Sequence, residues 1–232
     1  MTNADSPRYP GGSISVKLSL ARGHVVSWNK MAVAGYLEGL TFKIASAQER
    51  ESALDLRRQI YTAEHGKSGI DDLDAIATHL VAVDARGAVV STLRILGPRQ
   101  RPFDLEHFVS VESILPAGSI PAEISRFCVE KSHRVVHRGQ AVHLGMLKLL
   151  YEFACRQGIT DLLTLVLPGV EKIYEAVLFV RLPIVIDHPT WGAATLMLLN
   201  LDQARQKSAD HPIAKLLFHT SVPNVLLKST DR

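Results

Sequence analysis

Hydrophobic and polar residues repeat along the chain with the periods of both strands and helices. Residues 41–45 read TFKIA and predict a strand, and the Ser-x-x-Glu capping box at 46–49 predicts the start of a helix. On that helix, apolar residues between Ala53 and Tyr61 gather on one face. Arg57 falls inside this face, which is typical either of a side chain that reaches a rim or of a charge directed into a buried site.

The middle of the chain predicts three strands. Two apolar segments flank the turn DARG and predict a β-hairpin over 79–96, and EISRFCVE at 123–130 predicts the next strand. Arg94 shares a strand face with apolar residues, so a charge again lies in an apolar row. Glu123 and Arg126 place a carboxylate and a guanidinium three residues apart on a strand that otherwise suits a core.

The rest of the chain alternates helices and strands. The patterns predict a helix over 141–157, a buried strand over 161–167, a helix over 170–182, and strands over 183–186 and 192–201. The order β-α-β-β-β-α-β-α-β, followed by the further strand at 192–201, is typical of an α/β protein whose mixed sheet is covered by helices. We expect a loosely held arm over 1–40, a folded domain over 41–202 and a helical extension over 203–232.

Composition narrows the functional classes. The 232 residues carry a formal net charge of only +3, which argues against a dedicated nucleic-acid-binding protein. The two cysteines, Cys128 and Cys155, lack CxxC spacing and indicate buried thiols rather than a disulfide or a zinc site. The polar N-terminus lacks the pattern of a signal sequence, and no apolar run is long enough for a transmembrane segment. We therefore expect a cytoplasmic protein.

Several common catalytic motifs are missing from the sequence. There is no GxSxG nucleophile elbow, no Walker loop and no GxGxxG after a predicted strand. His133 and His137 are four residues apart in a basic stretch without an acidic or cysteine partner, so we expect no metal site.

A basic turn precedes the helix expected at Ala141. Backbone N–H groups at a helix start lack partners and bind phosphate well, and Arg134 and Arg138 add positive charge beside Gly139. The stretch is typical either of a phosphate cradle or of a tight connection between a strand and a helix.

The segment HRGQAV, with EISRF on the strand before it, resembles the GNAT acyltransferase superfamily. The family motif is Gln/Arg-x-x-Gly-x-Gly/Ala; Gly139 and Ala141 match it, whereas Val136 stands where Gln or Arg is usual. The resemblance implies a mixed, mostly antiparallel sheet with a splayed central strand pair and flanking helices. It also implies that Arg134, Arg138, Gly139 and Ala141 hold the phosphate of an acyl-phosphopantetheine donor.

Four motifs in order carry a narrower resemblance. They are LRRQIYxxExG at 56–66, Asp71-x-x-Asp74, LRIL around Arg94, and ExSRF at 123–127. Together they resemble the acyl-homoserine-lactone synthases and, more closely, the related N-acyl amino acid synthases, over roughly 42–200. The former family usually has a Trp after the helix motif, where this chain reads HGKSG.

The resemblance implies one electrostatic cluster at an acceptor site, formed by Arg57, Asp71, Asp74, Arg94, Glu123 and Arg126. Strict alternation puts Glu123 and Arg126 on opposite strand faces, so both can join the cluster only if the strand bulges or splays. Glu123 would be the general base, and an arginine fork would hold an amino acid carboxylate in two hydrogen bonds. The alternative is an ion-pair network that only fixes a loop.

The function implied is transfer of a fatty acyl group from acyl carrier protein, or from acyl-coenzyme A, to the α-amine of an amino acid. No permanently bound cofactor is expected. The alternatives are an acyl-homoserine-lactone synthase that uses S-adenosylmethionine and a catalytically idle GNAT-like binding module. Tyr174 is a candidate general acid for the leaving thiolate, with Phe179 in that place in a second alignment. The basic segments 97–101 and 131–138 suit an acidic carrier protein, or are simply solvated surface.

Overall fold

The protein is described here by a computed structural model, which covers residues 37, 39–134, 136–207, 212–219 and 224–226. The expected N-terminal arm therefore lies almost wholly outside the described residues. Within them, no helix is long and apolar enough to cross a membrane.

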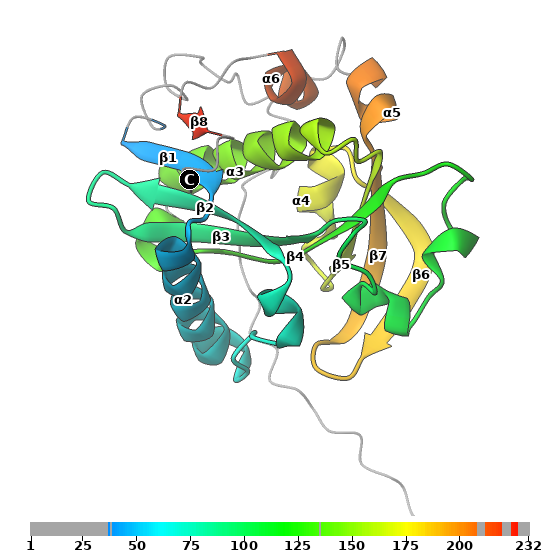
Figure 1. Cartoon of the computed structure of the whole chain (residues 1–232), viewed down its shortest axis with the longest axis horizontal. Coiled ribbons are helices and arrows are strands. Elements are labelled where there is room, and N and C mark those ends of the chain that lie inside the picture. The colour runs from blue at the N-terminus through cyan, green and yellow to red at the C-terminus, as the bar shows by residue number, and fades with distance from the viewer. Residues whose placement is uncertain (1–36, 38, 135, 208–211, 220–223, 227–232) are drawn as a thin grey trace, which may run out of the picture.

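An open eight-stranded sheet forms the centre of the molecule (Figure 1), with the strand order β6-β7-β5-β4-β3-β2-β1-β8. The strands are β1 Leu40–Ile44, β2 Thr78–Asp84, β3 Val89–Leu96, β4 Pro121–Val129, β5 Asp161–Val166, β6 Val180–His188, β7 Gly192–Asn200 and β8 Val225–Leu226. Neighbouring strands are antiparallel except in the pairs β4–β5 and β1–β8. The predicted mixed, mostly antiparallel sheet is confirmed.

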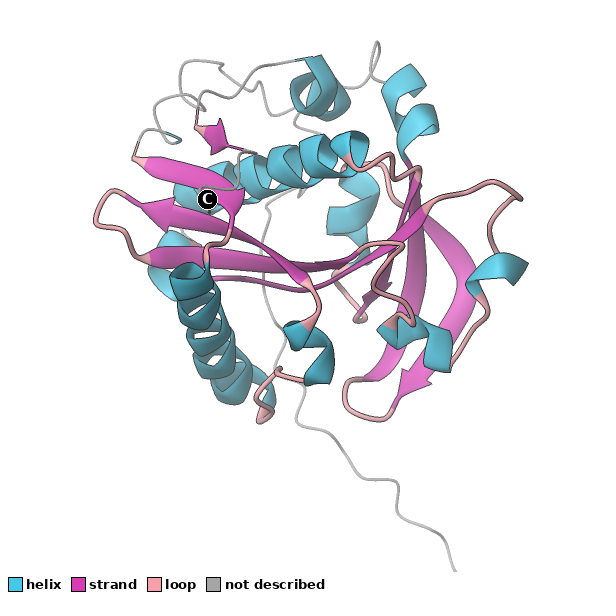
Figure 2. Cartoon of the chain, viewed as in Figure 1, coloured by secondary structure: helices cyan, strands magenta, loops and turns pink. Residues whose placement is uncertain are grey.

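Helices cover both faces of this sheet (Figure 2). The α-helices are α2 Ala47–His65, α3 Val136–Arg156, α4 Glu171–Ala176, α5 Leu201–Gln206 and α6 Pro212–His219. Within the described residues, four short 3-10 helices lie in the connections, namely η1 Asp72–Ala75, η2 Asp104–His107, η3 Val111–Ser113 and η4 Lys131–His133. Helix α2 packs on β2, β3 and β4, whereas α3 packs on the opposite face against β1, β2 and β3.

The sequence pattern located most elements correctly, and two boundaries were wrong. Ser46 caps α2 in a complete capping box with Glu49, as the pattern predicted. Helix α3 begins at Val136 instead of Ala141, because helical structure extends into the basic segment before its apolar face starts. Helix α4 ends at Ala176, and the residues expected to continue it enter strand β6 at Val180.

The main hydrophobic core lies between the sheet and α3. Phe42 of β1 packs directly against Gly145 of α3, where an added Cβ atom would lie 2.1 Å from the Phe42 ring. Glycine therefore lets the helix approach the sheet here. Smaller apolar clusters lie beneath α2, where Leu56 and Ile60 pack on Cys128 of β4.

Strands β4 and β5 pair only at their first residues. The parallel ladder joins Pro121, Ala122 and Glu123 to residues 161–163, although both strands continue beyond it. The two strands therefore separate after Glu123, which is the splayed central pair predicted for the fold.

Strand β4 also contains the bulge that would bring its charges together. Thr92 of β3 pairs with Cys128, but Arg94 pairs with Ser125, so β4 has one extra residue between the two pairs. Arg126 lies in this bulge with φ of 57°, in the left-handed region that bulky residues rarely adopt. The alternation of β4 is thereby interrupted between Glu123 and Cys128.

Candidate active site

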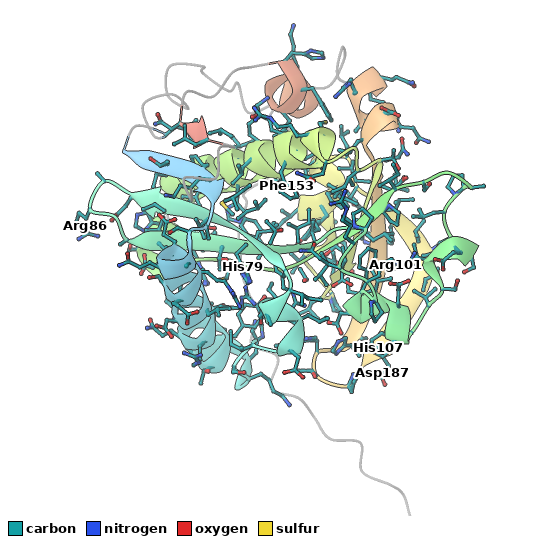
Figure 3. All side chains as sticks on the ribbon, viewed as in Figure 1. His79, Arg86, Arg101, His107, Phe153 and Asp187 are labelled. Atoms are coloured by element: carbon teal, nitrogen blue, oxygen red, sulfur yellow. The ribbon has the colours of Figure 1, made fainter. Side chains whose placement is uncertain are left out.

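The first part of the site is a buried triad of Arg57, Asp74 and His79 beneath α2. Arg57 Nη1 donates to Asp74 Oδ1 at 2.5 Å, and its Nη2 lies 3.2 Å from His79 Nδ1. His79 Nε2 lies 3.1 Å from the carbonyl oxygen of Asp74, which can only accept. Nε2 therefore carries the proton, and Nδ1 accepts from Arg57. Figure 3 places His79 between the sheet and α2.

His79 was missed in the sequence because it opens an apolar strand. It pairs with Arg94 across β2 and β3, so its side chain lies on the same face as that arginine. Burial lowers the pKa of His79, and the Arg57 guanidinium lowers it further. The imidazole is thus kept neutral, in the form that can accept from Arg57.

Asp71 joins the two other arginines of the predicted cluster. Its Oδ1 accepts from Arg94, and its Oδ2 accepts from Arg126 at 2.7 Å. Burial alone would raise the pKa of Asp71, but Arg94 and Arg126 outweigh it and lower the pKa. Asp71 also forms a capping box with Asp74 around η1, which links this carboxylate to the buried triad. The structure therefore brings Arg57, Asp71, Asp74, Arg94 and Arg126 together.

The bulge of β4 directs Arg126 toward the α2 side of the sheet. Its guanidinium lies 3.5 Å from Asp104 of η2 and stacks at 4.8 Å on the ring of Trp191. Ser125, the preceding residue, accepts from Arg94 Nε at 3.0 Å on the same side. Asp71 thus engages one Nη of each arginine, whereas Arg94 Nη2 and Arg126 Nε are buried without a hydrogen-bond partner among the described residues.

Glu123 lies at the point where β4 and β5 separate, with only 3% of its surface exposed. Its Oε2 accepts from the backbone N–H of Leu105 at 3.0 Å, and no hydrogen bond joins it to Arg126 among the described residues. Burial, aided by the charge of Asp104, raises the pKa of Glu123 to about 7, although Leu105, Arg94 and Arg126 oppose the rise. A carboxylate with this pKa can exchange a proton near neutral pH.

The turn between β6 and β7 contributes residues that the sequence did not single out. Trp191 lies edge-on to Tyr61 of α2 at 5.4 Å and to His65 at 6.0 Å. His188 lies 6.3 Å from Trp191 and 5.2 Å from the Phe108 ring, between ring centroids. These residues meet only through the fold, since more than 120 positions separate Tyr61 from His188.

The expected phosphate turn is only partly described. Arg134 donates to the carbonyl of Val129 and forms an ion pair of 2.6 Å with Glu64 of α2, so it ties the turn to the fold. The side chains of Arg138, Gly139 and Ala141 lie outside the described part of the molecule. Because α3 starts at Val136, Gly139 and Ala141 lie within the helix rather than before it. The unpaired N–H groups of its first turn belong to residues 136–139.

Tyr174 lies on α4, beside Phe179, with 5.3 Å between ring centroids and an interplanar angle of 88°. Burial raises the pKa of Tyr174 to about 12, and a hydrogen bond with Thr164 opposes this. Thr164 follows the last β5 residue that pairs with β4, so the phenol lies near the strand separation. Tyr174 and Phe179, the two residues that the sequence offered for the position of the general acid, are therefore neighbours.

The described ranges contain no group of three or more His, Cys, Asp or Glu residues that could hold a metal ion. The charges of the site instead consist of arginines and carboxylates that face one another across α2, β3, β4 and η1.

Comparison with solved structures defines the class of this fold. A putative N-acetyltransferase from Lactobacillus plantarum superposes with a TM-score of 0.52 at 19% identity, covering 70% of this chain and 97% of that chain. The acyl-homoserine-lactone synthase LasI superposes with a TM-score of 0.58 at 18% identity, covering 82% of this chain and 98% of LasI. The CoA-dependent acyl-homoserine lactone synthase BjaI superposes with a TM-score of 0.60 at 20% identity, covering 79% of this chain and 92% of BjaI. The protein has the fold of the GNAT acyltransferases.

The narrower assignment comes from the sequence. The family model for the N-acyl amino acid synthase FeeM matches residues 52–202, and the chain belongs to this family. The structure of FeeM, an N-acyl amino acid synthase from uncultured soil microbes, superposes with a TM-score of 0.63 at 18% identity, covering 76% of this chain and 96% of FeeM. No curated protein sequence is significantly similar to the chain.

Proposed function

We propose that the protein transfers a fatty acyl group from the thioester of acyl carrier protein to the α-amine of an amino acid. The observation that carries this proposal is the position of Glu123. A buried carboxylate with a pKa of about 7 lies where β4 and β5 separate, beside the arginine–aspartate cluster. Membership of the N-acyl amino acid synthase family supports the choice of an amino acid as acceptor.

The chemistry requires a base because the acceptor arrives as an ammonium ion. Glu123 takes one proton from the ammonium, directly or through a water molecule, and leaves a neutral amine. The amine nitrogen attacks the thioester carbonyl, the C–N bond forms, and the electron pair of the carbonyl moves onto oxygen. Backbone N–H groups of β4 beyond the paired residues stabilise that oxyanion.

Collapse of the intermediate expels the thiolate, and the nitrogen loses its second proton to solvent. Tyr174 is the candidate that protonates the thiolate, since it lies near the strand separation and burial keeps its phenol protonated at neutral pH. The products are an N-acyl amino acid and the free thiol, so atoms and charge balance without a cofactor.

The cluster divides into two roles under this proposal. Arg57, fully buried and bound to Asp74 and His79, fixes the position of η1. Arg94 and Arg126, held by Asp71, supply the positive field on the acceptor side. Asp71 is the most exposed member of the cluster and is placed to attract the acceptor ammonium.

The donor enters from the other end of the strand separation. Its pantetheine arm lies between β4 and β5, and its phosphate binds the N–H groups of the first turn of α3 beside Arg138. The exposed side chains of Lys131 and Arg99 suit docking of an acidic carrier protein. Arg101 suits it less, because Glu106 and Glu112 already pair with it.

The test is a matrix of donors and acceptors read by mass spectrometry. Acyl carrier protein thioesters and matched acyl-coenzyme A thioesters are each incubated with the enzyme and a panel of amino acids. We expect open-chain N-acyl amino acids, formed faster from the carrier protein and without S-adenosylmethionine. A lactone product that requires S-adenosylmethionine would identify a homoserine-lactone synthase instead. Equal or faster turnover with coenzyme A would exclude the carrier protein as preferred donor, and absence of acylation would support the idle binding module.

A further inference from the structure

Three buried donor groups without acceptors lie where Arg126 meets the end of β6 and the β6–β7 turn. Trp191 Nε1, His188 Nε2 and Arg126 Nε are each buried, and none has a hydrogen-bond partner among the described residues. His188 is 6% exposed as a whole residue. Arg126 stacks on the Trp191 ring, and Asp104 lies 3.5 Å from Arg126 and 3.5 Å from His188. The three donors therefore belong to one small region.

The protonation of His188 follows from its backbone contact. The N–H of Thr190 donates to His188 Nδ1 at 3.0 Å. Nδ1 accepts this hydrogen bond with its lone pair and therefore carries no proton. The ring proton of the neutral imidazole must then lie on Nε2. This N–H is near Asp104 Oδ2 but makes no hydrogen bond with it in the described part of the chain.

The three unpartnered N–H groups indicate which kind of ligand would bind here. A buried N–H that has lost water without gaining an acceptor is unfavourable, so such groups in native proteins are usually satisfied by a ligand or a water molecule. All three unpartnered groups are donors, and one belongs to a guanidinium, so an anionic group with several acceptor atoms fits best. Asp71 already engages Nη1 of Arg94 and Nη2 of Arg126, so an acceptor carboxylate needs further donors.

We propose that His188 and Trp191 bind the α-carboxylate of the acceptor amino acid, together with Nε of Arg126. This inference rests on the proposed function, because it assigns a subsite for that acceptor. The two residues determine specificity: they select an amino acid over a simple amine and take no part in the proton transfer. The subsite lies near the proposed base, since Asp104 contacts Arg126 and His188 and its charge also acts on Glu123.

The test compares an amino acid with its carboxamide in each variant. Trp191→Phe keeps an aromatic face against Arg126 but removes the indole N–H. His188→Asn keeps an oxygen that can accept from Thr190 and removes the donor at Nε2. Val185→Ala, on the exposed part of the same strand, is the matched control. The readout is kcat/KM for the amino acid divided by kcat/KM for the amide. The amines of the two acceptors differ in basicity, and comparing each variant's ratio with that of wild type cancels this difference.

We expect each variant to lower this ratio about tenfold or more, the usual loss when a buried polar contact to substrate is removed. Turnover of the amide and KM for the acyl donor should stay near wild type, and Val185→Ala should change nothing. Equal loss for both acceptors would mean that the hairpin residues are structural, and the inference would be wrong.

A binding measurement separates failure of this inference from failure of the proposed function. The chain has two tryptophans, so Trp28→Phe leaves Trp191 as the sole indole fluorophore. If no acyl transfer is found, this variant is titrated with the panel amino acids and their amides. A fluorescence change with the carboxylates alone would support the subsite even though the proposed reaction had failed. No change, or the same change with the amides, would overturn it.

Discussion

Ser125 and Arg126 are neighbours in the sequence, yet both side chains lie on the face of the sheet that α2 covers. Ser125 contacts Arg94 there, and Arg126 reaches Asp71. An ordinary strand would send one of them to the opposite face. The bulge, with Arg126 at a φ of 57°, makes the exception and assembles the charged cluster. Unfavourable backbone geometry at a cluster of buried charges is typical of a functional site.

Removal of Arg57 should destabilise the fold far more than removal of its neighbour Arg58. Arg57→Met leaves the buried carboxylate of Asp74 without its cation, and the expected loss of unfolding free energy is about 3–5 kcal/mol. Arg58→Met breaks only an exposed pair with Asp55, and should cost about 1 kcal/mol or less. Urea unfolding of both variants measures the difference. Similar losses would show that the Arg57 pair contributes no more than a surface contact.

The stability should depend on pH through His79. Its folded pKa lies below the ordinary value of 6.5, so the folded state resists a proton that the unfolded chain accepts. The unfolding free energy should therefore fall as pH drops below 6.5 and continue to fall until the folded pKa is reached. His79→Gln cannot titrate, so its stability should decline less over the same interval. Parallel curves for wild type and variant, from urea unfolding at a series of pH values, would contradict this assignment.

Asp104 should set the pH at which the enzyme gains activity. Its negative charge helps to raise the pKa of Glu123 to about 7, so Asp104→Asn should shift the acidic limb of the kcat/KM profile to lower pH. Asp84→Asn, at the end of β2, should leave the limb in place. A merely structural role for Asp104 would lower the rate at every pH and leave the limb where it is.

The sequence predicted the fold well because each element carried a local signal. The capping box of Ser46 and Glu49 is a local signal, and so is the alternation of β2 and β3. Neither depends on a distant residue. The start of α3 was misplaced because its first residues are basic and lack an apolar stripe. Phe179, assigned to the helix, instead lies just before β6, where tertiary pairing overrides helical propensity.

Local sequence patterns pointed to candidate site residues only where charges interrupted apolar rows. Arg57, Arg94 and Glu123 stood out for that reason, and all three are buried. Asp71 and Asp74 were instead proposed from the family resemblance. His79 and Trp191 gave no such signal. His79 opens an apolar strand, and Trp191 lies in the β6–β7 turn far along the chain, so their positions depend on pairing and packing that no local pattern records.

The central claim is that Glu123 is the general base rather than a structural carboxylate. Glu123→Gln keeps the size of the side chain and an oxygen that can accept from Leu105, but it cannot take a proton at neutral pH. We expect a fall in the rate of acyl transfer of about two to four powers of ten. The melting temperature should change little. If the carboxylate were only structural, the variant would unfold more easily while its folded fraction stayed active.

Single-turnover acyl transfer from the carrier protein thioester, measured across pH beside thermal unfolding, tests this most directly. Wild type should gain activity through a pKa of about 7, and Glu123→Gln should lose both the rate and that pH dependence while remaining folded. A folded Glu123→Gln variant that transfers the acyl group at the wild-type rate would contradict the account.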